Sequence, residues 1–256
     1  MNYLGYRGDD AKTPFGDFYR PEMAALPKHV VAALENGPQA EPVLPAFDDA
    51  AALLDDGYQQ TENGYGAVGG GGIQVSVRTD MPGVTPEMWA WWFGWHGCDP
   101  RRYKLWHPRA HVSALWSDGG DQQGYVGRTS LVQEYLGSEF TRAAIQFEPP
   151  DRVGIDQERL NGGVAICARL GSSDVPVDVG WLIHHVRPTA DGAEMRSRFW
   201  MGGRHVALRS GRSLADRAIR PFAARQLPNP RDLMVHCAQE MNQLAGFLPE
   251  LYARFQ

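Results

Sequence analysis

His236 and Glu240 are the two residues whose types and spacing most directly suggest chemistry. They lie in residues 231–248, where apolar residues recur at the three-to-four spacing of a helix with one buried face: Leu233, Cys237, Met241, Leu244 and Leu248. Residues four apart share one surface of such a helix, so the imidazole and the carboxylate project together beside the apolar stripe. A divalent metal ion would explain such a pair directed toward a core, although this spacing also occurs by chance in many helices.

A second pair of histidines lies in residues 103–111, with the sequence YKLWHPRAH. His107 and His111 are also four residues apart, but Pro108 interrupts a helix and the residues that follow favour a strand. The two histidines are therefore not expected to share a helix face, and each by itself is typical of a structural or surface histidine. His111 begins the expected strand, where its side chain can point into a cavity.

Two further strands contain acidic and histidine candidates. Glu134 lies mid-strand among apolar neighbours, where a carboxylate faces either solvent or a partner, and solvent is the more ordinary environment. Glu139 is the alternative acidic candidate, at a turn or exposed position. His184 and His185 are adjacent in one strand, so one can line a cavity while the other points outward. None of these spacings identifies a site by itself.

The composition excludes several classes of protein. The chain has 256 residues, enough for one large domain or a domain with a subdomain, and its formal net charge is −5. No cluster of Lys and Arg is present, so neither nucleic acid nor an anionic membrane is an expected partner. No apolar run is long enough for a transmembrane helix, and the N-terminus has no signal pattern. Three widely spaced cysteines predict reduced thiols in a cytoplasmic protein.

Seven segments between residues 73 and 200 have the alternation and the turn boundaries of β-strands. They are 73–78, 111–116, 130–136, 142–147, 163–170, 179–186 and 193–200. The last six follow one another without an intervening helix, which predicts an antiparallel meander rather than a doubly wound sheet. A curved sheet that grips the helix at 231–248 is the simplest α+β arrangement that buries both apolar surfaces, and it encloses a cavity.

Residues 1–72 are rich in Pro, Ala and Gly and end in four consecutive glycines. The best helix candidates in this region are 22–36 and 48–54. We interpret residues 1–72 as an N-terminal arm or subdomain that wraps the main body or a second subunit, and residues 73–256 as the main domain.

A short tryptophan-rich helix is expected to begin after Thr85. Thr can cap a helix, and the Pro and Glu that follow suit its first turn. Trp89, Trp92 and Trp95 have helical spacing, so this helix is expected to lie over the sheet as part of the core.

Taken together, these segments resemble the 2,4-diacetylphloroglucinol hydrolase and phloretin hydrolase family. The similar segments are 103–111, 127–137, 144–147, 194–200 and 236–240. The resemblance covers roughly residues 73–256 in the same order, and the combination is far more specific than any one motif. It implies a helix-grip fold similar to the birch-pollen-allergen and START-type domains. It also implies that the smaller N-terminal region helps to form a homodimer.

The activity that the resemblance implies is zinc-dependent hydrolysis of the carbon–carbon bond between an acyl group and a phloroglucinol ring. The family's zinc ion is held by two His and two Glu. By motif position these correspond to His111, Glu134, His236 and Glu240, with Glu139 as the alternative to Glu134.

The resemblance also implies residues for catalysis and substrate binding. A family histidine near the scissile bond corresponds to His184, with His185 as the second choice, and Tyr103 corresponds to a tyrosine that hydrogen-bonds a substrate oxygen. Where the diacetylphloroglucinol enzyme has a second substrate-binding tyrosine, this chain has Phe199, and the lost hydroxyl weakens the case for that particular substrate. Trp181 and the tryptophan-rich helix would provide an aromatic lining for a flat phenolic ring.

We therefore expect an enzyme that acts on a small phenolic ketone and releases a phenol and a carboxylic acid. Zinc would act as a Lewis acid, and His184 would transfer the proton. Two alternatives stay open. One is a helix-grip protein that binds an aromatic or polyketide ligand without chemistry, with His236 and Glu240 as a hydrogen-bonded pair. The other is a polyketide cyclase that uses acid–base residues on the same scaffold.

Overall fold

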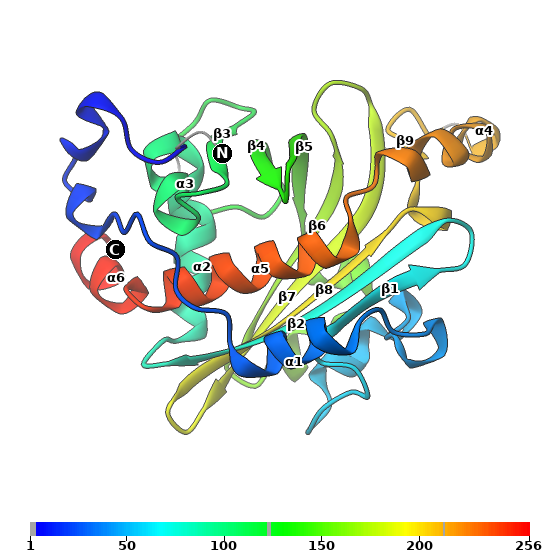
Figure 1. The fold of residues 1–256 in the computed structure, drawn as a ribbon, viewed down its shortest axis with the longest axis horizontal. Helices are drawn as coiled ribbons and strands as arrows, with labels where there is room; N and C mark the ends of the chain where they lie inside the picture. The colour runs from blue at the N-terminus through cyan, green and yellow to red at the C-terminus, as the bar shows by residue number, and fades with distance from the viewer. Residues whose placement is uncertain (1–3, 122–123, 212) are drawn as a thin grey trace.

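The computed structural model describes residues 4–121, 124–211 and 213–256, and its central element is one curved antiparallel sheet (Figure 1). Within these ranges the sheet has nine strands, in the order β1-β2-β8-β7-β6-β5-β4-β3, with β9 paired to β7. The strands are β1 Gly64–Val68, β2 Gly72–Pro82, β3 His111–Trp116, β4 Thr129–Leu136, β5 Glu139–Glu148, β6 Val164–Ser172, β7 Val177–Thr189, β8 Gly192–Met201 and β9 Ala207–Leu208.

The expected meander is confirmed, because β3 to β8 pair consecutively and each pair is antiparallel. The seven predicted strands are all present, and most extend a few residues beyond the predicted ends. β1 was not predicted, because its sequence GYGAV contains two glycines that weaken a strand pattern. β1 pairs with β2, so the sheet extends into the range that the sequence assigned to the N-terminal arm.

Six α-helices accompany the sheet in the described ranges. They are α1 Lys28–Asn36, α2 Pro86–Trp95, α3 Pro100–Trp106, α4 Ser213–Ala223, α5 Pro230–Ala245 and α6 Leu248–Phe255. Short 3₁₀ helices lie at Gly8–Ala11, Gly16–Phe18, Glu41–Val43, Phe47–Leu54, His96–Cys98, Pro150–Val153, Gln157–Leu160, Gly203–His205 and Ala224–Gln226.

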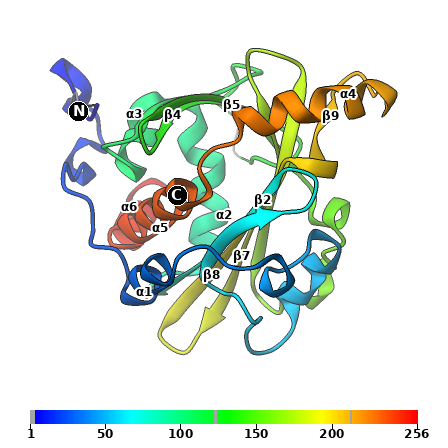
Figure 2. The ribbon, with the colours of Figure 1, turned by 45° about the vertical axis from the view of Figure 1, so that its right-hand side comes forward.

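α5 crosses the concave face of the sheet, as Figures 1 and 2 show from two directions. Its apolar residues are buried there and belong to the same core cluster as side chains of β2, β4, β6, β7 and β8. This arrangement is the expected helix-grip α+β fold. The predicted helix over 231–248 is wrong at its C-terminal end, because α5 ends at Ala245 and Phe247 has a non-helical conformation. Pro249 has no backbone N–H, so it fits the first turn of a new helix rather than the interior of α5.

The tryptophan-rich helix is α2, and it begins after Thr85 as predicted. The Thr85 hydroxyl accepts a hydrogen bond from the backbone N–H of Met88 at 3.4 Å. Trp89 and Trp92 are fully buried, whereas Trp95 is half-buried. α2 therefore contributes core rather than surface, and it packs against β6 and β7.

The N-terminal region differs from the prediction in its helices. α1 begins at Lys28 rather than at residue 22, directly after Pro27, and the segment predicted as a helix at 48–54 is a 3₁₀ helix. The region packs on the main body: Tyr6 donates a hydrogen bond to the carbonyl of Arg101 at 2.8 Å, and Gln243 of α5 accepts one from the backbone of Ala24 at 2.6 Å. The role of this region in a homodimer stays a prediction.

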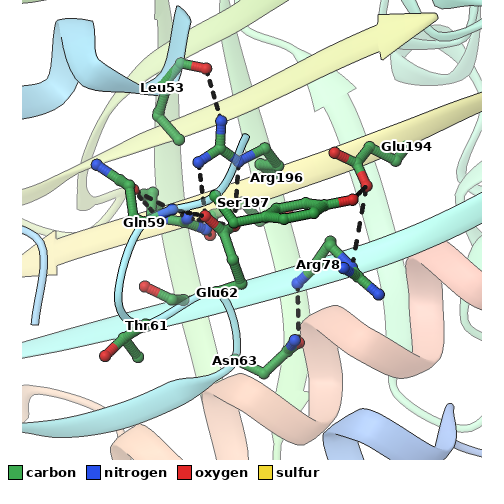
Figure 3. Close-up of polar contacts among 12 residues, drawn as sticks. Leu53, Gln59, Thr61, Glu62, Asn63, Arg78, Glu194, Arg196 and Ser197 are labelled. Atoms are coloured by element: carbon green, nitrogen blue, oxygen red, sulfur yellow. Dashed lines mark hydrogen bonds and ion pairs between the residues drawn. The ribbon is translucent and has the colours of Figure 1, made fainter. Parts of the chain in front are cut away.

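A buried charged cluster attaches the N-terminal region to the outer face of the sheet (Figure 3). Arg196 and Arg198 of β8 are 1% and 0% exposed, and both guanidinium groups donate to Glu62, at 2.5 Å and 2.6 Å. Arg196 also donates to the Leu53 carbonyl at 2.8 Å, and Arg198 donates to Gln59 at 3.0 Å. The segment from Leu53 to Glu62 is therefore held by charge-assisted hydrogen bonds, which the sequence did not indicate.

The described residues contain no helix that is both long and apolar enough to cross a membrane. Cys98, Cys167 and Cys237 are free thiols, as expected.

Candidate metal centre

Three elements bring the four predicted metal ligands together. His111 is the first residue of β3 and lies directly opposite Glu134 of β4 in the strand register. His236 and Glu240 lie one turn apart on α5, which crosses the same face of the sheet. Residues separated by more than a hundred positions therefore converge at one point, and three of them, His111, Glu134 and His236, form a group that could hold a metal ion.

The spacing of the side-chain atoms suits one ion. His111 Nε2 lies 3.3 Å from His236 Nε2, 3.5 Å from Glu134 Oε2 and 3.4 Å from Glu240 Oε2. His236 Nε2 lies 3.5 Å from Glu134 Oε2 and 3.7 Å from Glu240 Oε2. Atoms bound to a tetrahedral zinc ion at about 2.0–2.1 Å are about 3.3–3.4 Å apart. Each imidazole nitrogen is thus close to the separation that a tetrahedral ion requires, both from the other imidazole and from the two carboxylate oxygens.

The tautomer of His111 also suits a metal ligand. Its Nδ1 lies 2.9 Å from the carbonyl oxygen of Tyr103, and a carbonyl can only accept, so Nδ1 donates. Nε2 then presents its lone pair to the centre of the cluster. A histidine whose second nitrogen is held by a carbonyl is the usual arrangement at protein metal sites.

The pKa values of Glu240 and His236 are both raised, so in both groups the protonated form is favoured more than usual. Burial raises the pKa of Glu240 to about 8, assisted by the charge of Glu134 and opposed by His236. Burial by itself would lower the pKa of His236, but the hydrogen bond and charge of Glu134, together with Glu240, outweigh it and raise the pKa. With both carboxylates ionised and both imidazoles neutral the site carries two negative charges, which a divalent cation balances.

Tyr103 lies against this cluster. Its hydroxyl donates a hydrogen bond to Glu134 Oε2, and its ring stacks on the His111 imidazole at a centroid distance of 3.6 Å. Burial, followed by the charges of Glu134 and Glu240, raises the pKa of Tyr103 well above its usual value, so its hydroxyl is a neutral donor. Tyr103 is thus placed between the candidate ligands and the cavity.

The structure distinguishes between Glu134 and Glu139 as the candidate acidic ligand. Glu134 points into the cluster, whereas Glu139 begins β5, is exposed and lies at the outer edge of the cavity.

The structure also shows which of the adjacent histidines, His184 or His185, faces the cavity. His184 lines the cavity, and its Nδ1 lies 2.7 Å from the Ser197 hydroxyl. Burial lowers its pKa to about 3, so the ring is neutral at neutral pH. His185 faces the outer side of the sheet, opposite Arg196, and burial together with the charges of Arg196 and Arg187 lowers its pKa to about 4.

Phe199 lines the cavity, as predicted, and its ring centroid lies 5.9 Å from that of His184.

The prediction that Trp181 lines the cavity is wrong. Trp181 stacks on Phe47 at 5.7 Å and belongs to the outer cluster beneath residues 47–54. The reason is strand alternation: Trp181 and His185 share the outer face of β7, whereas Leu182 and His184 share the inner face.

Two further histidines, His107 and His96, lie near the cluster, and the sequence analysis did not consider His96. His107 is 4% exposed, stacks on His236 at 4.8 Å and lies within 3.3 Å of Gln239 Oε1, so it supports the His236 imidazole. His96 lines the cavity, and its Nδ1 lies 2.9 Å from the Trp92 carbonyl. His107 was expected to be structural or on the surface, and the four-residue spacing of His107 and His111 was a signal that Pro108 concealed.

The cavity that holds these residues has a volume of about 1130 Å³. Its inner part is lined by Phe93, His96, Tyr103, Ser130, Glu134, His184, Phe199, His236 and Glu240. Polar and aromatic groups therefore meet in one enclosed space that could hold an organic ligand next to the candidate metal centre.

The fold and the site together define a helix-grip α+β protein with two histidines and two glutamates converging in its cavity. More specifically, the chain belongs to the DAPG hydrolase PhiG domain family, whose model matches residues 43–253. It is 30% identical to the 2,4-diacetylphloroglucinol hydrolase of Pseudomonas protegens, over 94% of this chain and 84% of that protein. It is 30% identical to the phloretin hydrolase of Eubacterium ramulus, over 98% of this chain and 93% of that protein.

Among solved structures, Ara h 8.0201 aligns with 68% of this chain and 99% of its own, at 10% identity and a TM-score of 0.36. The assignment of the fold rests on the strand order and on the position of α5, which are independent of that alignment.

Proposed function

We propose that this protein is a zinc-dependent hydrolase that cleaves the carbon–carbon bond between an acyl group and a phloroglucinol-type ring. Water supplies the hydroxyl that ends on the acyl carbon and the proton that ends on the ring carbon. The products are the free phenol and a carboxylic acid, so the reaction consumes one water and needs no oxidant.

The observation that carries this proposal is a pair of imidazole nitrogens 3.3 Å apart, each of which lies 3.4–3.7 Å from both carboxylate oxygens, in a chain of this family. Nitrogen and oxygen donors at tetrahedral spacing suit zinc. His111, Glu134, His236 and Glu240 would hold the ion, which would supply Lewis-acid stabilisation of negative charge on the ring and acyl oxygens. The names of two relatives, a diacetylphloroglucinol hydrolase and a phloretin hydrolase, support the substrate class.

The phenolic ring makes the bond cleavable. An aryl carbanion is a poor leaving group, but a ring with several hydroxyls can take a proton on the carbon that bears the acyl group and become a keto tautomer. The substrate then resembles a 1,3-diketone, and the bond breaks with the electron pair received by the ring as an enolate.

Two residues of the cavity suit the proton movements that this chemistry requires. His184 is neutral, so it can accept a proton from water and deliver it to the ring carbon. Tyr103 retains its proton and donates it in a hydrogen bond to Glu134, so its hydroxyl oxygen can accept a hydrogen bond from a ring hydroxyl, which orients the ring beside the candidate ligands.

Metal analysis combined with turnover tests the proposal. Purified protein should contain about one zinc ion per chain, and Glu240→Ala should lose it, since a carboxylate ligand is removed from the set. Dialysis against a chelator should abolish hydrolysis of an acylphloroglucinol, and added zinc should restore it. Full activity of the metal-free protein would refute the metal-dependent mechanism. Binding of the ligand without hydrolysis by the zinc-loaded protein would favour a binding protein.

A further inference from the structure

The cavity continues beyond the candidate metal centre toward α4. Its volume of about 1130 Å³ is slightly above the roughly 300–1,000 Å³ that is usual for small-molecule pockets. Along β7 the lining extends from His184 to Val177, seven residue steps, or about 23 Å at the usual rise of a strand. A phloroglucinol ring with an acetyl group would occupy only the inner part.

The chemical character of the lining changes along this length. The inner end contains polar groups, namely Glu134, His236 and Glu240 of the candidate ligands together with Tyr103 and His184. The next part is an apolar row that crosses four neighbouring strands, β5, β6, β7 and β8. Its members lie side by side because Ile145 pairs with Leu170, and Gly180 pairs with both Leu170 and Met201. Val177 and Val179 continue this apolar surface outward. The cavity is therefore amphipathic, with a polar end and an apolar end.

The mouth of the cavity is unusually apolar for an exposed surface. Phe140, Val175 and Phe222 line it and are 47%, 52% and 68% exposed. On α4, Ile219, Phe222 and Ala223 have the spacing of one helix face, and all three line the cavity. α4 is held in place by Asp216, which accepts a hydrogen bond from the backbone of Leu208 in β9 at 2.7 Å. Exposed apolar side chains gathered at the entrance of a cavity mark a surface that a ligand covers.

Charged side chains surround these apolar residues at the rim. Arg142 and Asp174 form an ion pair with one another at 3.2 Å, and Glu139 and Arg225 also line the cavity. The apolar residues of the mouth are therefore the part of the rim that an alkyl chain would contact.

We infer that the preferred substrate is an acylphloroglucinol with a medium-length alkanoyl chain, between hexanoyl and decanoyl, whose chain lies along the apolar row and beneath α4. This inference rests on the proposed function and adds the nature of the acyl group. The ring and its carbonyl occupy the polar end, and the chain covers the apolar mouth. Each methylene that leaves water should improve binding by about threefold.

Binding of 2-alkylphloroglucinols from methyl to decyl, measured by calorimetry on the zinc-loaded protein, tests the inference without hydrolysis, because these compounds have no acyl bond to cleave. Kd should fall by about threefold for each added methylene up to octyl. Val175→Asp should weaken binding of the octyl compound by at least about tenfold, since it places a charge against the chain. Val126→Asp is the matched control, because Val126 is also 52% exposed but does not line the cavity.

A Kd that does not change with chain length, or an equal effect of the two valine substitutions, would overturn the inference. Hydrolysis of acetyl- and octanoylphloroglucinol by the same preparations separates this result from the proposed function. Turnover with a constant Kd would refute only the preference for a long chain. Dependence of Kd on chain length without turnover of either ketone would refute the hydrolase and leave a site for an amphipathic phenol.

Discussion

His184 is a neutral imidazole placed on the inner face of the sheet, in contact with the cavity and with the Ser197 hydroxyl. Burial lowers its pKa to about 3. The neutral ring has one nitrogen that donates and one that accepts, so it can relay a proton without carrying a charge at rest. His185 has the same chemical nature but faces the outer side, toward Arg196.

We therefore expect His184→Ala to retain its zinc and to lower kcat by at least about 10²-fold, because a positioned general acid–base contributes this much to a rate. Turnover and zinc content should be measured on the same folded sample. His185→Ala is the control, and its kcat should stay within a few-fold of the wild type. A larger loss in His185→Ala than in His184→Ala would reverse the assignment of the two histidines.

At the scale of elements, one carboxylate lies at the centre of the contact between the segment Leu53–Glu62 and the sheet. Glu62 accepts hydrogen bonds from two guanidinium groups that have almost no contact with solvent. Burial by itself would raise the pKa of Glu62, but Arg196 and Arg198 outweigh it and lower the pKa to about 2. Loss of the carboxylate leaves the two buried guanidinium groups with neutral oxygen acceptors, among them the Leu53 carbonyl and Gln59, in place of their negative partner.

Glu62→Gln should therefore lower the free energy of unfolding by about 3 kcal/mol, as expected when one partner of a buried ion pair is removed. Urea unfolding measures this change. Glu148→Gln is the matched control, since Glu148 and Arg152 form a more exposed pair at 3.9 Å and the expected loss is below about 1 kcal/mol. Equal losses in the two variants would show that the cluster does not stabilise the fold.

The lowered pKa of Glu62 also predicts that the free energy of unfolding depends on pH. Its pKa is lower in the folded protein than the ordinary value of 4.5, so its stabilising effect is complete above about pH 4.5 and is lost as the pH falls toward about 2. The difference in unfolding free energy between wild type and Glu62→Gln should be constant near neutral pH and should decrease below about pH 4.5. A difference that grows on acidification would contradict the assignment.

At the scale of the whole molecule, the candidate ligands join parts of the chain that are otherwise far apart. β3 and β4 supply two ligands and α5 supplies two, so an ion at this point would connect the sheet to the helix that it grips. An ion that binds only the folded state stabilises it by an amount that grows with the logarithm of its concentration divided by its Kd. Stability should therefore depend on the metal as well as on the core.

Removal of the metal by a chelator should lower Tm by about 5–10 °C, which corresponds to zinc at roughly a hundred times its Kd and a chain of this length. Thermal unfolding followed by circular dichroism measures the shift. In the double variant His236→Ala, Glu240→Ala the chelator should have no effect. A chelator-dependent shift of equal size in that variant would place the metal elsewhere.

Local patterns in the sequence predicted much of the fold and part of the site. The alternation of apolar residues predicted the strands from β2 to β8, and the spacing of apolar residues predicted α5. The four-residue interval placed His236 and Glu240 on one helix surface, because helix geometry depends only on neighbours. Motif resemblance then indicated His111 and Glu134, which no local spacing connects.

Only the tertiary structure decided how these parts meet. The register of β3 against β4 brings His111 opposite Glu134, and the direction of β7 turns His184 inward and Trp181 outward. The partner of Arg196 and Arg198 is likewise Glu62, more than 130 residues away. The physical reason is that periodicity determines which residues share a face of one element. Contacts between elements depend on how all of them pack around a common core, and one stretch of sequence does not contain that information.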